Sequence, residues 1–271
     1  MAHHIHPTAL VDPSAQLGKD VEIGPFSIVG PNVVLEDEVR LVSHVSIVGR
    51  THIGARTVVY PFSSLGHPPQ DLKYHGEGSC LIIGTDNTIR EYVTMQPGTE
   101  GGLMETRVGN HGLFMAGSHV AHDCLVGNFV VMANQATLAG HVAVGDHVII
   151  GGLVGVLQFV RIGQHAIVGG LSAVDSDVIP YGSVKGDRAF LCGINAIGLK
   201  RRGFDRESID SLRKAYAHIF DKSNAMMEER IIQASHLFPS PVIEDVVQFI
   251  RETSKHGICL PHDKSRDKLN G

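Results

Sequence analysis

Large apolar residues recur every six positions along most of this chain. The spacing starts at Ile5 and continues to Leu65, resumes for three repeats at Ile83, and then runs from Val108 to Val174. All 26 anchor positions are apolar, and in 24 of the repeats the residue four places later is small or β-branched. A period of six fits neither the 3.6 residues of a helical turn nor the alternation of an isolated strand. The pattern therefore indicates a repeat architecture.

The repeat predicts a mainly β fold, a parallel β-helix. Each six-residue unit supplies one short strand and one corner, so three units make a coil of eighteen residues. Coils stack as neighbouring strands do, about 4.8 Å apart, and the anchors then form a continuous interior that no single unit could bury. An irregular sandwich of short strands is the alternative, but its turns fall at uneven intervals of roughly eight to twelve residues.

Two segments, 71–82 and 101–107, interrupt the repeat. They follow the eleventh and the fourteenth units, which belong to the same face of a three-sided coil. We therefore expect two loops that leave the same corner, on the face that also carries unit 120–125. Loops on a rigid scaffold are common places for binding groups.

A different period follows the last repeat. Apolar residues from Ile209 to Phe220 lie on one face of a helix for which Asp205 is a suitable N-cap. A second helix is expected over 225–234, and a third begins at Ser240-Pro241, with proline at the first helical position. The predicted domains are a β-helix over 1–190 and a helical domain over 191–271.

Composition narrows the class of protein. The chain has 271 residues, a formal net charge of −5 and a pI near 6.4, which disfavours a nucleic-acid partner. Its four cysteines form no C-x-x-C pair, a usage typical of a reducing compartment. No apolar stretch has the length of a membrane span. We expect a cytoplasmic protein without stable membrane insertion.

The eighteen-residue coil also predicts a chemical cluster at one corner. Because residues eighteen places apart stack, His122 lies next to Gly140 of the following coil, and Asp123 lies beside His141. A neutral imidazole can take a proton from a hydroxyl near pH 7, and an adjacent carboxylate can orient it. A glycine amide can stabilise a developing oxyanion. The residues expected to converge are His119, His122, Asp123, Gly140, His141 and Gln158.

Four segments carry a resemblance to a known family: 70–74, 117–124, 138–141 and 198–204. With the hexapeptide repeats, they resemble the UDP-N-acetylglucosamine O-acyltransferases of lipid A biosynthesis over essentially the full chain. The resemblance implies a left-handed β-helix and a homotrimer with active sites between subunits. It also implies transfer of a 3-hydroxyacyl group from acyl carrier protein to the glucosamine 3-hydroxyl of UDP-N-acetylglucosamine, the first step of lipid A biosynthesis.

The resemblance further implies roles for individual residues. His122 corresponds to the general base, Asp123 to its partner and Gly140 to the oxyanion donor. No metal is implied, and no cofactor beyond the phosphopantetheine of acyl carrier protein. Gly170 falls where the end of the acyl chain is limited. The residues implied in substrate binding are Gln70, Asp71, Lys73, His119, His141, Gln158, Asn195, Arg201 and Arg202. The chain departs from common family residues at Gln96, Leu157, Asp187, Arg188 and Ile197.

Three other functions fit parts of the same pattern. The sister N-acyltransferase of the pathway also uses hexapeptide coils, but normally has a separate domain before them. A trimeric zinc hydratase of the carbonic anhydrase type would use His119, His122 and His141 as ligands. A noncatalytic assembly module would leave the histidine column without a role.

Overall fold

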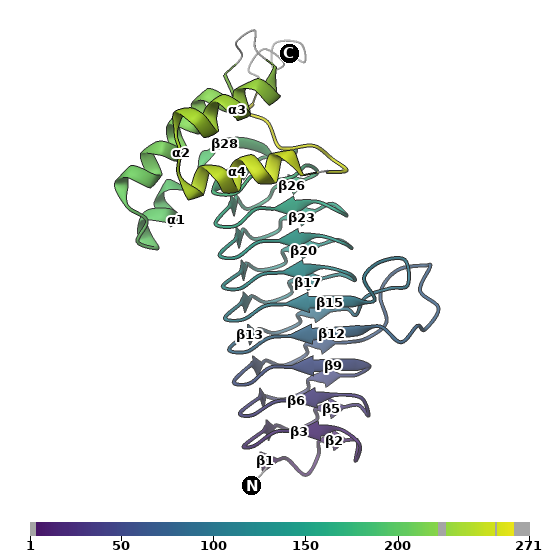
Figure 1. The fold of residues 1–271 in the computed structure, drawn as a ribbon. Helices are drawn as coiled ribbons and strands as arrows, with labels where there is room; N and C mark the ends of the chain where they lie inside the picture. The colour runs from purple at the N-terminus through teal and green to yellow at the C-terminus, as the bar shows by residue number, and fades with distance from the viewer. Residues whose placement is uncertain (1–3, 222–225, 253, 263–271) are drawn as a thin grey trace.

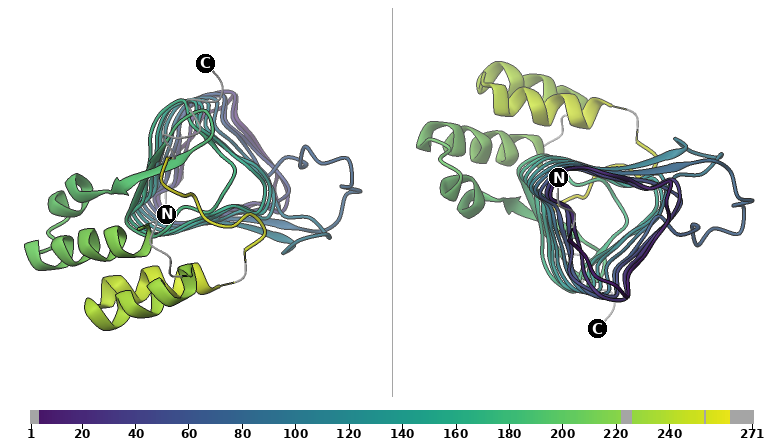
Figure 2. Two further views of the ribbon diagram at one scale, coloured as in Figure 1. Left: turned by 90° about the horizontal axis from the view of Figure 1, so that it is seen from above. Right: turned by 90° about the horizontal axis from the view of Figure 1, so that it is seen from below.

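The protein is a left-handed parallel β-helix with helices at one end (Figure 1). The computed structural model describes residues 4–221, 226–252 and 254–262. Viewed along its axis, the β-helix is a three-sided prism, as Figure 2 shows. Each of the strands β1–β26 ends at one of the 26 anchors, which confirms the predicted repeat.

The strands form three sheets, named A, B and C here. Sheet A contains β1 (His4–Ile5), β4 (Glu22–Ile23), β7 (Arg40–Leu41), β10 (Val58–Val59), β13 (Thr88–Ile89), β16 (Leu113–Phe114), β19 (Val131–Met132), β22 (Ile149–Ile150), β25 (Ile167–Val168), β27 (Gly182–Lys185) and β28 (Phe190–Ile194). Sheet B contains β2 (Leu10–Val11), β5 (Ile28–Val29), β8 (Ser46–Ile47), β11 (Ser64–Leu65), β14 (Thr94–Met95), β17 (His119–Val120), β20 (Thr137–Leu138), β23 (Gly155–Val156) and β26 (Ala173–Val174). Sheet C contains β3 (Gln16–Leu17), β6 (Val34–Leu35), β9 (Arg50–Ile53), β12 (Cys80–Ile83), β15 (Glu105–Val108), β18 (Leu125–Val126), β21 (Ala143–Val144) and β24 (Arg161–Ile162).

The strand register places residues eighteen apart beside each other wherever no loop intervenes. His119, for example, pairs with Thr137, and Val120 pairs with Leu138. The anchors from Ile23 onward are buried and form one continuous core. Ile5 remains 40% exposed, because none of the described residues forms a coil beneath the first one. Burial of stacked anchors therefore holds neighbouring coils in register.

Two loops leave the prism from the corner between sheets B and C, the B/C corner. Loop 1 comprises residues 66–79, and loop 2 comprises residues 96–104. Both project from the same edge in Figure 2, as predicted. The expected segments, 71–82 and 101–107, end three residues too late. β12 and β15 are four-residue strands whose extra inward side chains, Leu81 and Thr106, are buried.

The described residues of the C-terminal part add four helices to the end of the prism. They are α1 (Ala196–Arg201), α2 (Arg206–Ile219), α3 (Met227–Leu237) and α4 (Pro241–Arg251). Asp205 caps α2 by accepting a hydrogen bond from Ser208 N at 2.7 Å, and α4 begins at Pro241, both as predicted. The second predicted helix corresponds to α3, although residue 225 lies outside the described residues.

The sequence pattern predicted neither α1 nor the antiparallel hairpin of β27 and β28. This hairpin extends sheet A past the last coil, so the predicted domain boundary at 190/191 falls inside β28. None of the helices in the described ranges is long and apolar enough to cross a membrane.

Candidate active site

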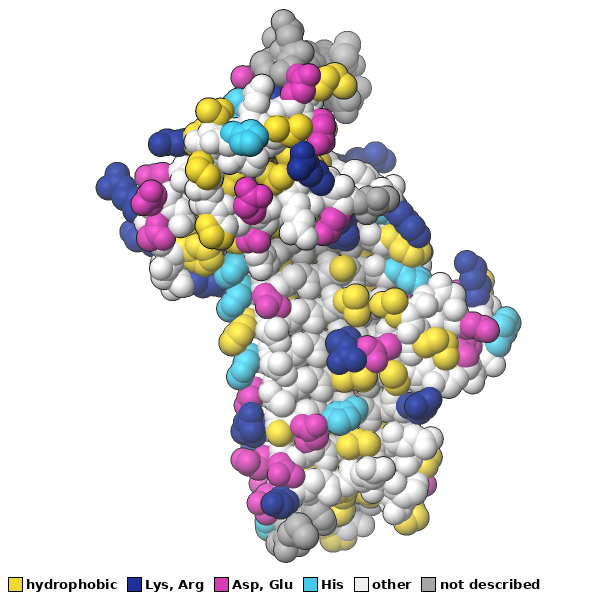
Figure 3. Space-filling view, in the orientation of Figure 1, with side chains coloured by type: hydrophobic (Ala, Val, Ile, Leu, Met, Phe, Trp, Pro, Cys, Tyr) yellow, Lys and Arg dark blue, Asp and Glu magenta, His cyan; other side chains and the backbone are white. Residues whose placement is uncertain are grey.

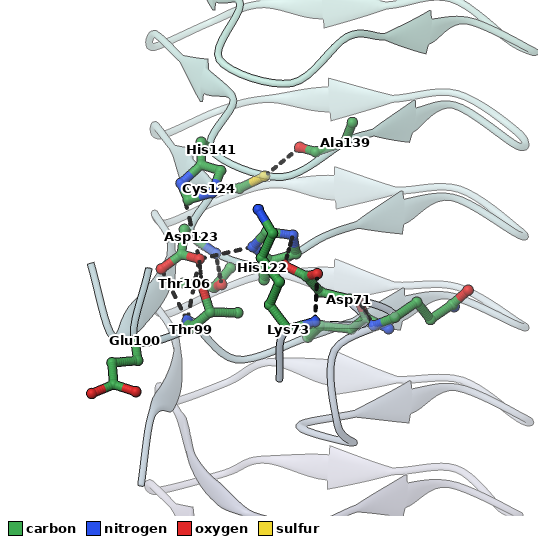
Figure 4. Close-up of polar contacts among 12 residues, drawn as sticks. Asp71, Lys73, Thr99, Glu100, Thr106, His122, Asp123, Cys124, Ala139 and His141 are labelled. Atoms are coloured by element: carbon green, nitrogen blue, oxygen red, sulfur yellow. Dashed lines mark hydrogen bonds and ion pairs between the residues drawn. The ribbon is translucent and has the colours of Figure 1, made fainter. Parts of the chain in front are cut away.

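The predicted histidine cluster forms at the B/C corner, next to the two loops (Figure 4). His122 and Asp123 follow β17, and Gly140 and His141 follow β20, the next strand of sheet B. The amide of His141 donates a hydrogen bond to the carbonyl of His122 at 3.0 Å. Stacking of neighbouring coils therefore brings these residues together, as the eighteen-residue spacing predicts.

His122 and Asp123 form a buried pair. Nδ1 of His122 lies 2.8 Å from Oδ2 of Asp123, and the two side chains are 6% and 0% exposed. A carboxylate on Nδ1 favours the tautomer that carries its proton there and leaves Nε2 as an acceptor. Nε2 lies 3.7 Å from Oδ2 of Asp71 in loop 1. The basic edge of the imidazole therefore faces Asp71 and loop 1.

Loop 2 holds the carboxylate of Asp123 in place. Oγ1 of Thr99 donates to it at 2.6 Å, the Thr99 amide at 3.1 Å, and the Leu103 amide at 2.7 Å. A Cβ atom at Gly102 would lie 2.4 Å from Oδ1 of Asp123, so only glycine lets the loop approach this closely. Burial raises the pKa of the Asp123 carboxyl, but the hydrogen bonds outweigh burial and hold this pKa below its ordinary value. Asp123 is therefore an anion at neutral pH.

Loop 1 brings Asp71 and Lys73 to the same corner. The Asp71 carboxylate accepts the Lys73 amide at 3.0 Å, which closes a tight turn that directs Asp71 toward His122. The base of the loop is fixed by Gln96, whose Oε1 accepts the Gln70 amide at 3.2 Å. Gln96 is buried, so this departure from the common family residue supports the loop.

His119 and His141 flank the buried pair on either side. His119 Nδ1 lies 2.7 Å from the Thr94 hydroxyl, and burial, then the nearby His122, lower the pKa of His119. Burial also lowers the pKa of His141, which Asp123 acts to raise. Both imidazoles are therefore neutral near pH 7 and available as hydrogen-bonding groups.

The amide of Gly140 has no hydrogen-bond acceptor among the described residues, although Gly140 is buried. At the corner between sheets C and A, the C/A corner, several equivalent amides do have acceptors. Asn110 N donates to Asn128 Oδ1 at 2.9 Å, and Asn128 N donates to Asp146 Oδ1 at 2.7 Å. A buried, unpaired amide is costly, which marks Gly140 N–H as a group available to a ligand.

Most of the remaining predicted binding residues lie at other corners of the same chain. Arg202 donates to the His147 carbonyl at 2.8 Å at the C/A corner, and Asn195 donates to the His165 carbonyl there at 2.9 Å. Asn195 also caps α1, whose last residue is Arg201. Gly170 follows β25 of sheet A, so it lies at the third corner, between sheets A and B. Gln158 is exposed at the B/C corner.

A column of stacked rings runs along the C/A corner and includes His147, whose carbonyl binds Arg202. His111, Phe129, His147 and His165 stack with centroids 4.6–4.7 Å apart. Figure 3 shows histidine and apolar side chains one above another along this edge, below the helices. Burial, with smaller contributions from His147 and Arg202, lowers the pKa of His165 to about 4. His111, His147 and His165 therefore belong to one stacked column of rings.

His122, Asp123 and His141 could offer one ligand atom each to a metal, since these atoms lie within 4.8 Å of one another. The three-imidazole hydratase site needs His119 instead of Asp123, and His119 is absent from this group. The Asp123 oxygens already accept donors from Thr99, Leu103 and His122. The arrangement fits an oriented imidazole better than a metal centre.

Comparison with known proteins identifies the family. The Caulobacter vibrioides acyl-(acyl-carrier-protein)–UDP-N-acetylglucosamine O-acyltransferase is 54% identical over 258 residues, covering 95% of this chain and 98% of that protein. The protein of the same name from Thermodesulfovibrio yellowstonii is 46% identical, with coverage of 95% and 99%. This chain belongs to the UDP-N-acetylglucosamine O-acyltransferase family. The family resemblance predicted from the four sequence segments is confirmed.

Solved structures agree with this membership in the UDP-N-acetylglucosamine O-acyltransferase family. UDP-N-acetylglucosamine acyltransferase from Campylobacter jejuni is 35% identical, with a TM-score of 0.90 over 95% of this chain and all of that one. The Francisella novicida UDP-N-acetylglucosamine acyltransferase is 36% identical, with a TM-score of 0.91 and coverage of 97% and 96%. A family model described as UDP N-acetylglucosamine O-acyltransferase, domain 2, matches residues 177–259.

Sequence reasoning missed the side chains that support the buried pair. Thr99 binds the Asp123 carboxylate, and the Thr106 hydroxyl accepts the Asp123 amide at 2.8 Å. Thr99 is the fourth residue of loop 2, and Thr106 is the sixth residue of the expected interruption at 101–107, so neither shares a column position with Asp123. The only feature of the sequence that pointed to these partners of Asp123 was that loop 2 leaves from the same corner.

Proposed function

We propose that this chain transfers a 3-hydroxyacyl group from acyl carrier protein to the 3-hydroxyl of the glucosamine in UDP-N-acetylglucosamine. The activity agrees with the names of its relatives. The observation that carries the assignment of the site is the pairing of His122 with the buried Asp123 carboxylate, next to the unpaired Gly140 amide. A base and an oxyanion donor side by side are what acyl transfer to a hydroxyl requires.

The reaction follows from these groups. Nε2 of His122 takes the proton of the acceptor hydroxyl, while the sugar oxygen attacks the thioester carbonyl. The carbonyl oxygen becomes negative in the tetrahedral intermediate and accepts a hydrogen bond from Gly140 N–H. Collapse of the intermediate breaks the C–S bond, and the leaving sulfur takes the proton back from the His122 imidazolium. Asp123, held as an anion, stabilises that imidazolium.

The flanking groups position the substrates. We assign Asp71, His119 and His141 to the sugar and acyl groups, because all three lie close to His122. We also assign Gln70 and Lys73 of loop 1, and the exposed Gln158 at the same corner, to substrate binding. We assign Arg201, Arg202 and Asn195 to the nucleotide, since guanidinium groups suit phosphate geometry. Gly170 limits the acyl chain. No metal or cofactor takes part other than the phosphopantetheine of the donor.

We further propose a homotrimer that acts in the cytoplasm. The proposed base, nucleotide and acyl-chain groups occupy three different corners of one chain, so one substrate could not touch them all within a monomer. A threefold assembly brings a corner of one copy against another corner of its neighbour. The location is supported by four cysteines that are free thiols.

Subunit mixing tests the shared site. Chains carrying His122→Ala and chains carrying Arg202→Ala are each expected to be inactive, but equal mixtures, unfolded and refolded together, should regain about a quarter of the wild-type activity. That fraction is the chance that an intact His122 corner faces an intact Arg202 corner. Sedimentation should give three times the chain mass of 29.2 kDa. A mixture as inactive as its parents would place both groups in one chain.

One assay tests the reaction itself. The protein is incubated with UDP-N-acetylglucosamine and a panel of 3-hydroxyacyl carrier proteins, and the product is weighed by mass spectrometry. We expect an O-acylated sugar nucleotide, and the donor that reacts fastest reports the preferred chain length. Acylation only of a UDP-glucosamine with a free amine would instead identify the sister N-acyltransferase. Thioester hydrolysis without a sugar product would reject acyl transfer.

A further inference from the structure

A short segment after α4 returns to the corner that carries the active site. Residues 254–259, the C-terminal strap, lie against the top of the B/C corner. The Gly257 carbonyl accepts the Asp177 amide at 2.8 Å, and the Cys259 amide donates to the Asp177 carbonyl at 2.7 Å. Asp177 is fully buried and lies beside Arg161 of β24, whose amide and guanidinium donate to its carboxylate at 2.8 and 2.7 Å. The strap is therefore attached to the last coil of the prism, above the coil that carries Gln158 and Phe159.

Two strap side chains reach down to the next coil. Nε2 of His256 lies 2.8 Å from the carbonyl of Gln158, and Nζ of Lys255 lies 3.3 Å from the ring centroid of Phe159. The Phe159 ring stacks on His141 with centroids 4.4 Å apart and planes 7° apart. An ammonium and a parallel ring cannot share one face of Phe159 at these distances. Phe159 is therefore held between Lys255 and His141.

The stack continues to the proposed base. The His141 ring meets the His122 ring edge-on, with centroids 5.0 Å apart. Its Nδ1 lies 4.0 Å from Oδ2 of Asp123, too far for a hydrogen bond. In the described part of the chain, no hydrogen bond fixes the His141 ring. Ring stacking from above is therefore what orients it.

We propose that the C-terminal strap forms the upper wall of the active site, and that Lys255 is a positioning residue that acts through Phe159 on His141. An ammonium over an aromatic face is attracted by the ring quadrupole, so Lys255 clamps Phe159 against the imidazole. A fixed His141 then presents its ring to the substrate in one orientation, beside His122. The expected effect on kcat rests on the proposed acyl transfer. The orientation of His141 by Lys255 and Phe159 does not depend on it.

The charges around His141 predict a measurable signature. Burial lowers its pKa most; Asp123 and Asp71 raise the pKa, whereas His122 and Lys255 lower it. Removing the Lys255 charge should therefore raise the pKa of His141. Removing the charge of a distant lysine should leave this pKa unchanged. This shift is read by NMR titration of the imidazole, with the His141 signal assigned by its loss in His141→Gln.

The experiment compares Lys255→Met, which keeps the length of the side chain, with Lys255→Arg, which keeps the charge over the ring. Lys255→Met should lower kcat about three- to tenfold with little change in KM, and should raise the pKa of His141. Lys255→Arg should stay within about twofold of wild type in kcat. Lys19→Met, at the opposite end of the prism, serves as the control and should match wild type in every measurement.

Several results would overturn the inference. Unchanged kcat and an unchanged His141 titration in Lys255→Met would remove Lys255 from the site. A rise in KM alone would make Lys255 a substrate contact instead. Failure of Lys255→Arg to restore kcat would reject the clamp on Phe159. If the wild-type protein itself showed no acyl transfer, the proposed function would fail, while the NMR titration would still decide whether the strap acts on His141.

Discussion

Replacing His122 with alanine is expected to lower kcat for acyl transfer by about a hundred- to ten-thousand-fold, the range that general acid–base groups contribute. Its Nε2 is the proposed proton acceptor, and its Nδ1 contact with Asp123 fixes both the tautomer and the ring. His141 cannot substitute, because its nearest ring nitrogen is 4.0 Å from that carboxylate. Initial rates with the preferred donor, followed by mass spectrometry, measure the loss.

The fold of the His122→Ala protein should survive. The Asp123 carboxylate retains its donors from Thr99 and Leu103, so the buried charge stays solvated by the protein. Thermal unfolding and sedimentation check this point. His52→Ala is the matched control, since that histidine pairs with Glu36 on the surface of sheet C and is 42% exposed. Turnover of His122→Ala close to that of His52→Ala would remove His122 from the mechanism.

The spacing of anchors was sufficient to predict the β-helix and to predict which residues of neighbouring coils meet at its B/C corner. A six-residue unit has a fixed geometry, so a count along the chain becomes a position in space. That is why His122 and Gly140, or Asp123 and His141, could be paired without any knowledge of the loops. Counted in the same way, Gly170 falls on a different face from His122, and β25 does lie in sheet A rather than in sheet B with β17.

The contacts that complete the site could not be counted in this way. Loop 2 has no period, so nothing in the spacing indicates that Thr99 and Leu103 bind the Asp123 carboxylate. The reach of Asp71 toward His122 depends on a turn at Lys73 and on the support that Gln96 gives to loop 1. Hydrogen bonds between irregular segments are set by three-dimensional closure, which a sequence period does not encode.

The sequence also did not predict that the chain returns to the B/C corner after α4. Segment 254–259 has neither helical nor hexad periodicity, and its contacts with Asp177 are made by backbone groups. Residues nearly a hundred positions apart, such as Gln158 and His256, meet because the helices carry the chain back across the prism. The helices were predicted as separate elements, but their packing on the last coils decides where the strap lies.

Replacing Gly140 with alanine is expected to lower kcat by about a hundredfold, the cost of displacing a reacting group by roughly 1 Å. A Cβ atom at this position would lie 2.4 Å from Cε1 and 2.5 Å from Nε2 of His122. Something must move, and the imidazole is the nearest group. The backbone at Gly140 is not in the left-handed region, so alanine introduces no strain of its own. The effect should therefore appear in kcat with little loss of thermal stability.

The control for this variant is Gly101→Ala in loop 2. A Cβ atom there meets nothing within 4 Å, and its backbone also lies outside the left-handed region, so activity should be unchanged. The double variant Gly140→Ala with His122→Ala separates the two possible causes. If the methyl group acts only by displacing His122, adding Gly140→Ala to His122→Ala should cause no further loss of kcat. An additional loss in the double variant would show that the methyl group also blocks the Gly140 amide from the oxyanion.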